Sequence, residues 1–242
     1  MPPVNDGFYV GYQPKAPQSA GRLMKAVVVT LFLLSICISL LVVTSQQPFA
    51  SSSFEFGTFK PYQGVLLEQP YPMLLSGARQ FLLVAPGKRG VAMLFRGKDT
   101  RAVSVEGSLI QRGEDSMLEI RPESIQQSAS TEPVPEATRI GRFRFRGEIV
   151  DTKCHFGVMN PGSGKVHRDC AIRCISGGIP PGLFVRDAQG QEGTLLLADL
   201  NGNALGRNIL PFAGKPVNVS GDLYRLGKLL VFRVDPGSFR EE

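Results

Sequence analysis

Motifs typical of enzymes are absent from this chain of 242 residues. It contains neither the H-E-x-x-H pattern of zinc proteases nor the G-x-S-x-G pattern that presents the nucleophile of α/β-hydrolases. Histidine occurs only twice, so a Ser-His-Asp triad would have to draw on one of those two residues. The sequence therefore does not point to an enzyme with a conventional nucleophile.

Cysteine is also scarce, with four residues and no Cys-x-x-Cys pair. This absence argues against a thioredoxin-like redox motif, and the absence of Cys-x-x-Cys-His argues against covalently attached haem. Three of the four cysteines and both histidines nevertheless lie in one segment, residues 153–174. We expect any chemistry of the protein to lie there.

Apolar residues make up 43% of the chain, which is enough for real hydrophobic cores. Residues 26–44 carry no charge and are long enough to cross a membrane as a helix. A signal peptide is the alternative, but its apolar core is usually shorter, about 7–15 residues, and small residues should follow it. Pro48 stands in that position here, so we expect an uncleaved anchor.

The distribution of charge predicts the orientation. Residues 1–25 hold Lys15, Arg22 and Lys25 against Asp6, whereas residues 45–59 hold no Lys or Arg. We expect an inner-membrane protein with a cytoplasmic N-terminus and periplasmic C-terminal domains. Of the net charge of +6, the last part, residues 139–242, carries +5. This charge suits anionic lipid headgroups or an acidic envelope partner better than nucleic acid, unless it is only scattered solvated charge.

One pattern occurs twice. Residues 103–109 (VSVEGSL) recur as residues 217–223 (VNVSGDL) at an offset of 114, and Gly113 and Gly227 then precede a second apolar stretch in each copy. Such alternation with a turn glycine is typical of a β-hairpin with one buried face. Residues 64–68 also match residues 147–151, and residues 81–84 match residues 183–185, more loosely.

These repeats predict a mainly β protein with two small OB-like barrels, a β-sandwich being the alternative. Pro, Glu, Ser and Gln between the copies predict a solvated linker. The expected parts are a cytoplasmic tail (1–25), a transmembrane helix (26–44), a first barrel (51–121), a linker (122–138) and a second barrel (139–236). The offset grows from 83 to 101 between the looser matches, which places about eighteen inserted residues, including the cysteines, in the second copy.

The inserted segment follows a strand that ends near Val150 and becomes helical over residues 169–175. Glycines in its loop and at its end are Gly162, Gly164, Gly177 and Gly178. Cys170 and Cys174 are four apart, and His167 precedes Cys170 by three, so all three share one helical face or nearly so. Cys154 would have to fold back over them.

Three hypotheses remain open for this segment. A disulfide from Cys154 to Cys170 or Cys174 would contribute roughly 3 kcal/mol and leave one thiol over. Alternatively, the three thiolates and His167 or His155 would bind zinc or copper(I). In the third hypothesis Cys170, near a helix N-terminus, is a reactive thiol. The cofactor is accordingly either none or a zinc or copper ion.

A basic strand precedes the segment. Arg142, Arg144 and Arg146 should point to one face, and Phe143 and Phe145 to the other. OB folds bind single-stranded nucleic acid through basic grooves and aromatic stacking. Because the two Phe would point away from the arginines and into the core, we expect no nucleic-acid binding.

Four pieces of the second copy occur together: residues 147–154 (GEIVDTKC), residues 170–175 (CAIRCI) with Gly178, residues 183–185 (LFV) and residues 214–221 (GKPVNVSG). This set resembles small exported bacterial domains of unassigned function that carry a Cys loop on an OB-like barrel. The resemblance covers residues 144–234 and implies a bacterial envelope setting and the barrel, but no activity. His167 and the loop FGVMNPGSGK go beyond the family's pattern.

We therefore expect a single-pass membrane protein with two exported barrels that acts as a non-catalytic accessory or assembly subunit of an envelope complex. Its partners would be the membrane and an envelope protein. The alternative is a metal-binding or thiol-redox protein that acts through residues 153–178.

Overall fold

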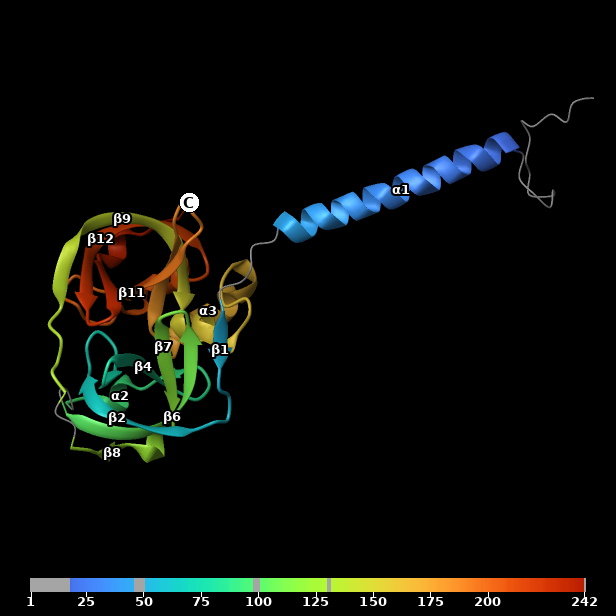
Figure 1. Ribbon diagram of the computed structural model, residues 1–242. Helices are drawn as coiled ribbons and strands as arrows, with labels where there is room; N and C mark the ends of the chain where they lie inside the picture. The colour runs from blue at the N-terminus through green and yellow to red at the C-terminus, as the bar shows by residue number, and fades with distance from the viewer. Residues whose placement is uncertain (1–17, 46–50, 98–100, 130–131, 242) are drawn as a thin grey trace, which may run out of the picture. The chain divides into compact units, whose positions relative to one another are not determined.

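The computed structural model describes residues 18–45, 51–97, 101–129 and 132–241 (Figure 1). The chain divides into two compact units, Met1–Phe49 and Ala50–Glu242. In the first, the helix α1 covers Gln18–Ser45, and Ala20–Ser45 is long and apolar enough to cross a membrane. A signal sequence near the N-terminus can also be long and apolar enough to meet this criterion, so α1 is a weak candidate for an anchor.

The second unit begins with a closed barrel, here called the first barrel. Its strands are β2 (Lys60–Leu67), β3 (Met73–Ser76), β4 (Arg79–Ala85), β6 (Ala102–Arg112) and β7 (Asp115–Ile120). β2 pairs with β3 and β6, β3 with β4, and β6 with β7, all antiparallel, and a parallel pairing of β4 with β7 closes the ring. This strand order is that of the OB fold, as predicted.

Shorter elements border the first barrel. They are β1 (Ser52–Phe54) and β8 (Gln126–Gln127) on β6, β5 (Arg89–Gly90) on β4, the helix α2 (Ala92–Phe95) and a 3₁₀ turn (Pro122–Ser124). The predicted linker, residues 122–138, thus contains a short strand in the described part. Glu132 in it accepts a hydrogen bond from the amide of Gly77 at 2.7 Å.

The second barrel repeats this arrangement. Its strands are β9 (Thr138–Asp151), β10 (Pro181–Arg186), β11 (Glu192–Ala198), β12 (Pro216–Leu226) and β13 (Leu229–Val234). The parallel pairing of β11 with β13 closes this ring. The remaining elements are the helix α3 (Arg168–Ser176), the strand β14 (Arg240–Glu241) and short helical turns (Cys154–Val158, Lys165–His167, Arg207–Phe212 and Pro236–Ser238).

The strand pairings test the sequence repeat. Gly64 pairs with Val103 as Gly147 pairs with Val217, so the offsets of 83 and 114 are both confirmed. Along β12, buried and less buried residues alternate strictly from Val217 to Leu223, as the pattern predicted.

One predicted match was wrong. Residues 81–84 form the third strand of the first barrel, whereas residues 183–185 form the second strand of the other. Leu74 is equivalent to Leu183 and Leu82 to Leu196, because each has the same pairing in its own barrel. The offset therefore grows from 83 to 109 between the first two strands, which makes the insertion 26 residues and not eighteen. Short apolar runs resemble one another too closely for the sequence to separate them.

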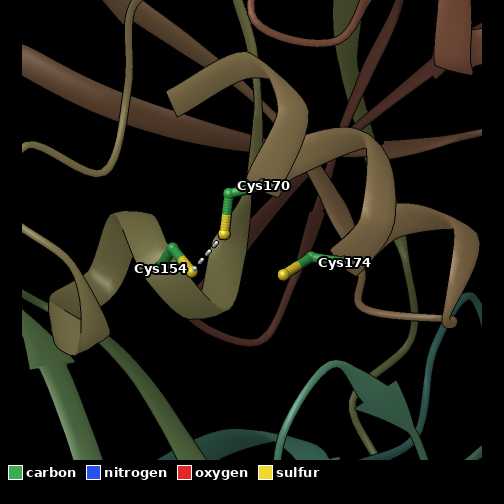
Figure 2. Close-up of side chains that lie close together, drawn as sticks. All are labelled: Cys154, Cys170 and Cys174. Carbon is green, nitrogen blue, oxygen red and sulfur yellow. Dashed lines mark hydrogen bonds between the residues drawn. The ribbon is translucent and has the colours of Figure 1, made fainter. Parts of the chain in front are cut away.

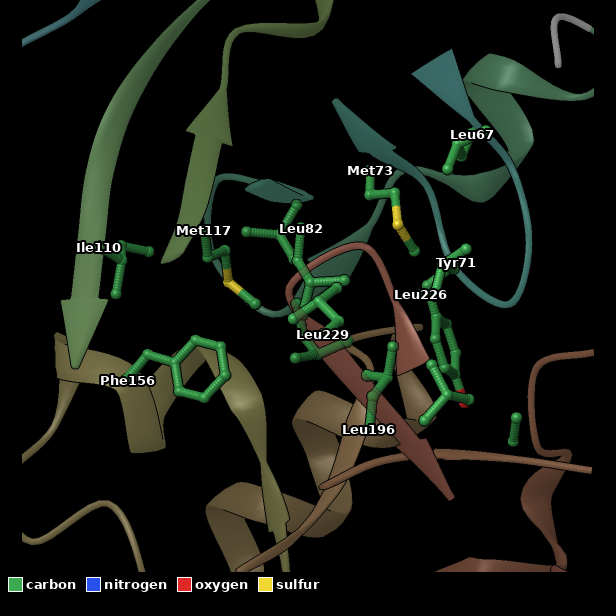
Figure 3. Close-up of a cluster of buried hydrophobic side chains, with 14 of the residues drawn as sticks. Leu67, Tyr71, Met73, Leu82, Ile110, Met117, Phe156, Leu196, Leu226 and Leu229 are labelled. Carbon is green, nitrogen blue, oxygen red and sulfur yellow. The ribbon is translucent and has the colours of Figure 1, made fainter. Parts of the chain in front are cut away.

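A shared hydrophobic core joins the two barrels (Figure 3). The first barrel and its loops contribute Leu67, Tyr71, Met73, Leu82, Ile110 and Met117, and the second contributes Phe156, Leu196, Leu226 and Leu229. Each barrel also has an interior cluster of its own. The described residues 51–241 thus pack as one body, with an apolar joint between two barrels.

Polar contacts cross the same joint. The Tyr71 hydroxyl donates to the carbonyl of Leu197 and accepts from the amide of Leu205, both at 3.1 Å. Lys153, which is almost fully buried, forms an ion pair with Glu119 of β7 and donates to the carbonyls of Ala85 (2.9 Å) and Gly87 (2.7 Å). A buried ammonium needs such partners, so this contact fixes the barrels in one relative position.

Candidate metal and thiol site

Three thiols meet in the connection between β9 and β10 (Figure 2). Cys154 lies on the helical turn that follows β9, and Cys170 and Cys174 lie on α3. Their sulfurs are all within 4.8 Å of one another, and Cys154 Sγ is 3.9 Å from Cys170 Sγ. All three are free thiols; Cys154 and Cys174 are buried and Cys170 is half-buried. The predicted return of Cys154 to the helix is confirmed.

The helix α3 places two of these thiols. The predicted helix, residues 169–175, is confirmed as Arg168–Ser176. Cys170 and Cys174, one turn apart, point toward Cys154, while Ala171 and Ile175 pack into the core of the second barrel. The amides of Gly177 and Gly178 donate to carbonyls of the last turn and end the helix.

The first barrel supplies a fourth group that the sequence did not indicate. Lys88, on the turn between β4 and β5, has its Nζ 2.7 Å from Cys170 Sγ and 3.6 Å from Cys174 Sγ. The hydrogen bond to Cys170 raises the pKa of Lys88, so the ammonium form is favoured. Lys88 precedes Cys170 by 82 residues. No local pattern could have found it, since only the joint between the barrels brings the two together.

The thiols differ in acidity. A hydrogen bond from Cys154, aided by the Lys88 ammonium and by Cys170, lowers the pKa of Cys174 to about 7 despite its burial. The same hydrogen bond and burial raise the pKa of Cys154. Of Cys154 and Cys174, Cys174 therefore ionises first, and Cys154 keeps its proton to donate to it.

Asp151 and His167 form a pair beside Cys154. His167 Nε2 lies 2.9 Å from Asp151 Oδ2, and the amide of Cys154 donates to Asp151 Oδ1 at 2.8 Å. Burial alone would raise the pKa of Asp151, but these hydrogen bonds outweigh it and lower the pKa. Asp151, Cys154 and His167 also have their ligand atoms within 4.8 Å of one another. His167 thus touches the site through Asp151, and among described residues it does not share one ligand group with all three sulfurs.

The structure brings His155 to a different place. Its ring is buried 4.7 Å from that of Phe184, and neither ring nitrogen has a well-aligned partner among the described residues. Burial, with the nearby Arg112 charge, lowers the pKa of His155 to about 4. It belongs to neither ligand group among the described residues.

The four loop glycines lie where backbone comes close to backbone or turns sharply. A Cβ on Gly162 would be 2.5 Å from the carbonyl oxygen of Cys154, and one on Gly177 would be 1.8 Å from that of Lys88. Gly164 and Gly178 both have positive φ. Gly177 thus allows the turn that carries Lys88 to lie directly against the end of α3.

The basic strand lies on β9, the strand that leads into the turn of Cys154. Arg142, Arg144 and Arg146 are exposed, as expected. Phe145 packs against Phe232 in the core, with ring centroids 5.1 Å apart. Phe143 stacks on Phe145 at 5.6 Å but stays 39% exposed, so only one of the two Phe reaches the interior.

The arrangement allows metal binding and thiol oxidation. A metal ion bound by thiolates at about 2.3 Å holds its sulfurs about 3.8–4.0 Å apart, which agrees with the separation of 3.9 Å between Cys154 and Cys170. A disulfide needs the sulfurs at about 2.05 Å, so the two side chains would have to move closer together to form one. No protein-family model, curated protein or solved structure matches the chain.

Proposed function

We propose that this protein is a membrane-anchored, exported protein of a bacterial envelope that binds one thiophilic metal ion through Cys154, Cys170 and Cys174. Its N-terminus is cytoplasmic and its barrels are periplasmic, and it binds the ion without catalysing a reaction. The observation that carries the proposal is the meeting of three thiols, within 4.8 Å, on an insertion into one of two equivalent barrels.

The ligand chemistry supports copper(I) or zinc. Thiolates are soft ligands and select these ions over magnesium or calcium. Three thiolates without a fourth protein ligand suit a three-coordinate copper(I), whereas zinc would need a water in the fourth position. The lowered pKa of Cys174 supplies one thiolate near neutral pH.

Lys88 and Asp151 support the same site from outside the ligand set. An ion bound by three thiolates has a net negative charge, which the Lys88 ammonium offsets from 2.7 Å. Asp151 holds the amide of Cys154 and the ring of His167, which fixes the turn that carries the first ligand.

The test is a metal titration of the full-length chain in mild detergent under anaerobic conditions. Copper(I) and zinc are each offered from a competing chromophoric chelator, and we expect one ion per chain. Cys174→Ser should weaken binding at least 100-fold, and His167→Ala, acting through Asp151, about 10-fold. Cys37→Ser is the matched control, because Cys37 lies in α1. Wild-type protein that leaves the ion on the chelator would contradict the proposal.

A second candidate function is that of an accessory or assembly subunit of an envelope complex. Two barrels joined by a common core form one body without a flexible joint in the described part, which suits a scaffold. The insertion also exposes Met159 (47%) and Val166 (85%), apolar side chains that a partner could cover.

Cross-linking in detergent tests this second candidate. A stoichiometric envelope partner should copurify with the wild-type chain and be lost from Val166→Asp, while the metal titration stays unchanged. Loss of the partner from Cys174→Ser and not from Val166→Asp would place the contact at the thiols instead. A chain that purifies alone after cross-linking argues against the subunit function.

A further inference from the structure

The contact between Lys88 and Cys170 is unusually close. A neutral N–H···O hydrogen bond has its heavy atoms about 2.9 Å apart, and sulfur is larger than oxygen, so an N–H···S bond should be longer. Lys88 Nζ is nevertheless 2.7 Å from Cys170 Sγ. A single oxygen atom bonded to both nitrogen and sulfur would hold them at about this separation. The contact is thus as close as that of a lysine and a cysteine joined through oxygen.

Backbone packing maintains this approach. The amide of Gly90 donates to the carbonyl of Gly177 at 2.9 Å, next to the turn that carries Lys88. Lys153 ties the carbonyls of Ala85 and Gly87, on either side of residue 86, to the second barrel. The turn is therefore held against the second barrel at both ends, so only the side chain of Lys88 has to move for its amine to reach the thiol.

Lys88 and Cys170 are accessible to an oxidant from solvent. Lys88 is exposed and Cys170 is half-buried, whereas Cys154 and Cys174 are buried. Cys170 is also the nearer of the two thiols to the amine, at 2.7 Å against 3.6 Å for Cys174. Cys170 is therefore the sulfur best placed to react with both an oxidant and the lysine.

We propose that Lys88 and Cys170 are a modification site at which an oxidant closes a covalent N–O–S bridge between the two barrels. With dioxygen as the oxidant, the amine and the thiol give Lys–NH–O–S–Cys and one water. An N–H bond, an S–H bond and the bond between the two oxygen atoms break, an N–O and an O–S bond form, and the second oxygen atom leaves as water with the two hydrogens. Nitrogen and sulfur each lose two electrons, and dioxygen gains four.

The bridge goes beyond metal binding and competes with it, because it removes Cys170 from the ligand set. A thiol reductant reverses it: four thiols supply four electrons, return the amine and Cys170, and release the bridging oxygen as water. The pair would thus sense oxidants, and the bridge would add a covalent link to a joint that packing already holds. The step starts from the neutral amine, so the Lys88 ammonium first gives a proton to solvent.

Mass spectrometry of the full-length chain in detergent tests the bridge. Metal-free protein is exposed to dioxygen, alkylated, and digested without reductant. We expect a linked pair of peptides that contain Lys88 and Cys170, heavier than their sum by one oxygen less two hydrogens. The link should block tryptic cleavage after Lys88 and should disappear with dithiothreitol, which distinguishes it from lysine methylation.

Matched variants separate the bridge from the metal site. Lys88→Arg keeps the positive charge beside Cys170 and should abolish the link. Cys154→Ser should lose metal binding and keep the link. Oxidation that yields only a disulfide, seen as a loss of two hydrogens without added oxygen, or only an oxidised cysteine with Lys88 free, would overturn the bridge and leave the metal proposal untouched.

Discussion

The two barrels have one topology and differ at one connection. Residues 68–72 join β2 to β3 in the first barrel, whereas residues 152–180 join β9 to β10 in the second. The longer connection holds all three clustered thiols, both histidines and α3. A closed barrel tolerates such an insertion because its ladder hydrogen bonds do not involve the connection. The thiol site therefore belongs to the second barrel, and the first barrel packs against it and contributes one side chain, Lys88.

The largest expected effect comes from removing the side chain by which the insertion enters the shared core. Phe156 is 2% exposed and packs among residues of both barrels. Phe156→Ala should lower the free energy of unfolding by about 3–5 kcal/mol. Urea unfolding of the full chain in detergent measures this, with Phe143→Ala as a half-exposed control of small effect. A loss confined to the second barrel, with two separate transitions, would show that the barrels unfold independently.

The buried ion pair at the joint should come next. Lys153→Met leaves Glu119 buried without its cation and should cost about 3 kcal/mol. The double variant Lys153→Met with Glu119→Leu should recover most of this, because no uncompensated charge remains. Equal losses in the single and double variants would mean that hydrogen bonds of Lys153 to the carbonyls of Ala85 and Gly87 carry the effect.

Acid should destabilise the second barrel through His155. Its pKa is lowered from 6.5 to about 4 in the folded chain, so below pH 6.5 only the unfolded chain takes up the proton. Stability should therefore fall by about 3 kcal/mol between pH 6.5 and 4, and His155→Phe should remove this slope. Asp115, whose pKa burial raises to about 6, acts in the opposite direction. The difference between wild type and variant cancels the Asp115 contribution, and a difference that is constant with pH would contradict the prediction.

The smallest expected effect comes from substitutions in the two equivalent hairpin turns. Gly113 and Gly227 have φ of 56° and 60°, a conformation that costs another residue about 1 kcal/mol. A Cβ on Gly113 would meet open space, whereas one on Gly227 would be 2.5 Å from Gln80 Oε1, which accepts from the amide of Lys228. Gly227→Ala should thus cost about 1 kcal/mol more than Gly113→Ala. Equal thermal unfolding shifts would mean that Gln80 moves without losing its hydrogen bond.

Local patterns determined the elements of this protein. A long uncharged run predicts α1, strict alternation predicts β6 and β12, and the spacing of Cys170 and Cys174 predicts their common face on α3. These properties depend on residues within a few positions of one another, so the sequence expresses them directly. The repeat also predicts two barrels, because a pattern that recurs at a constant offset indicates that both copies adopt the same fold.

Tertiary structure alone decided what the elements do together. The equivalence of β4 with β11, the turn of His155 toward Phe184 and the pairing of His167 with Asp151 depend on strand order and packing. Lys88 reaches Cys170 only because an apolar joint and a buried ion pair hold the barrels together. Contacts across such distances in the chain are selected by the total free energy of packing, and no local pattern records them.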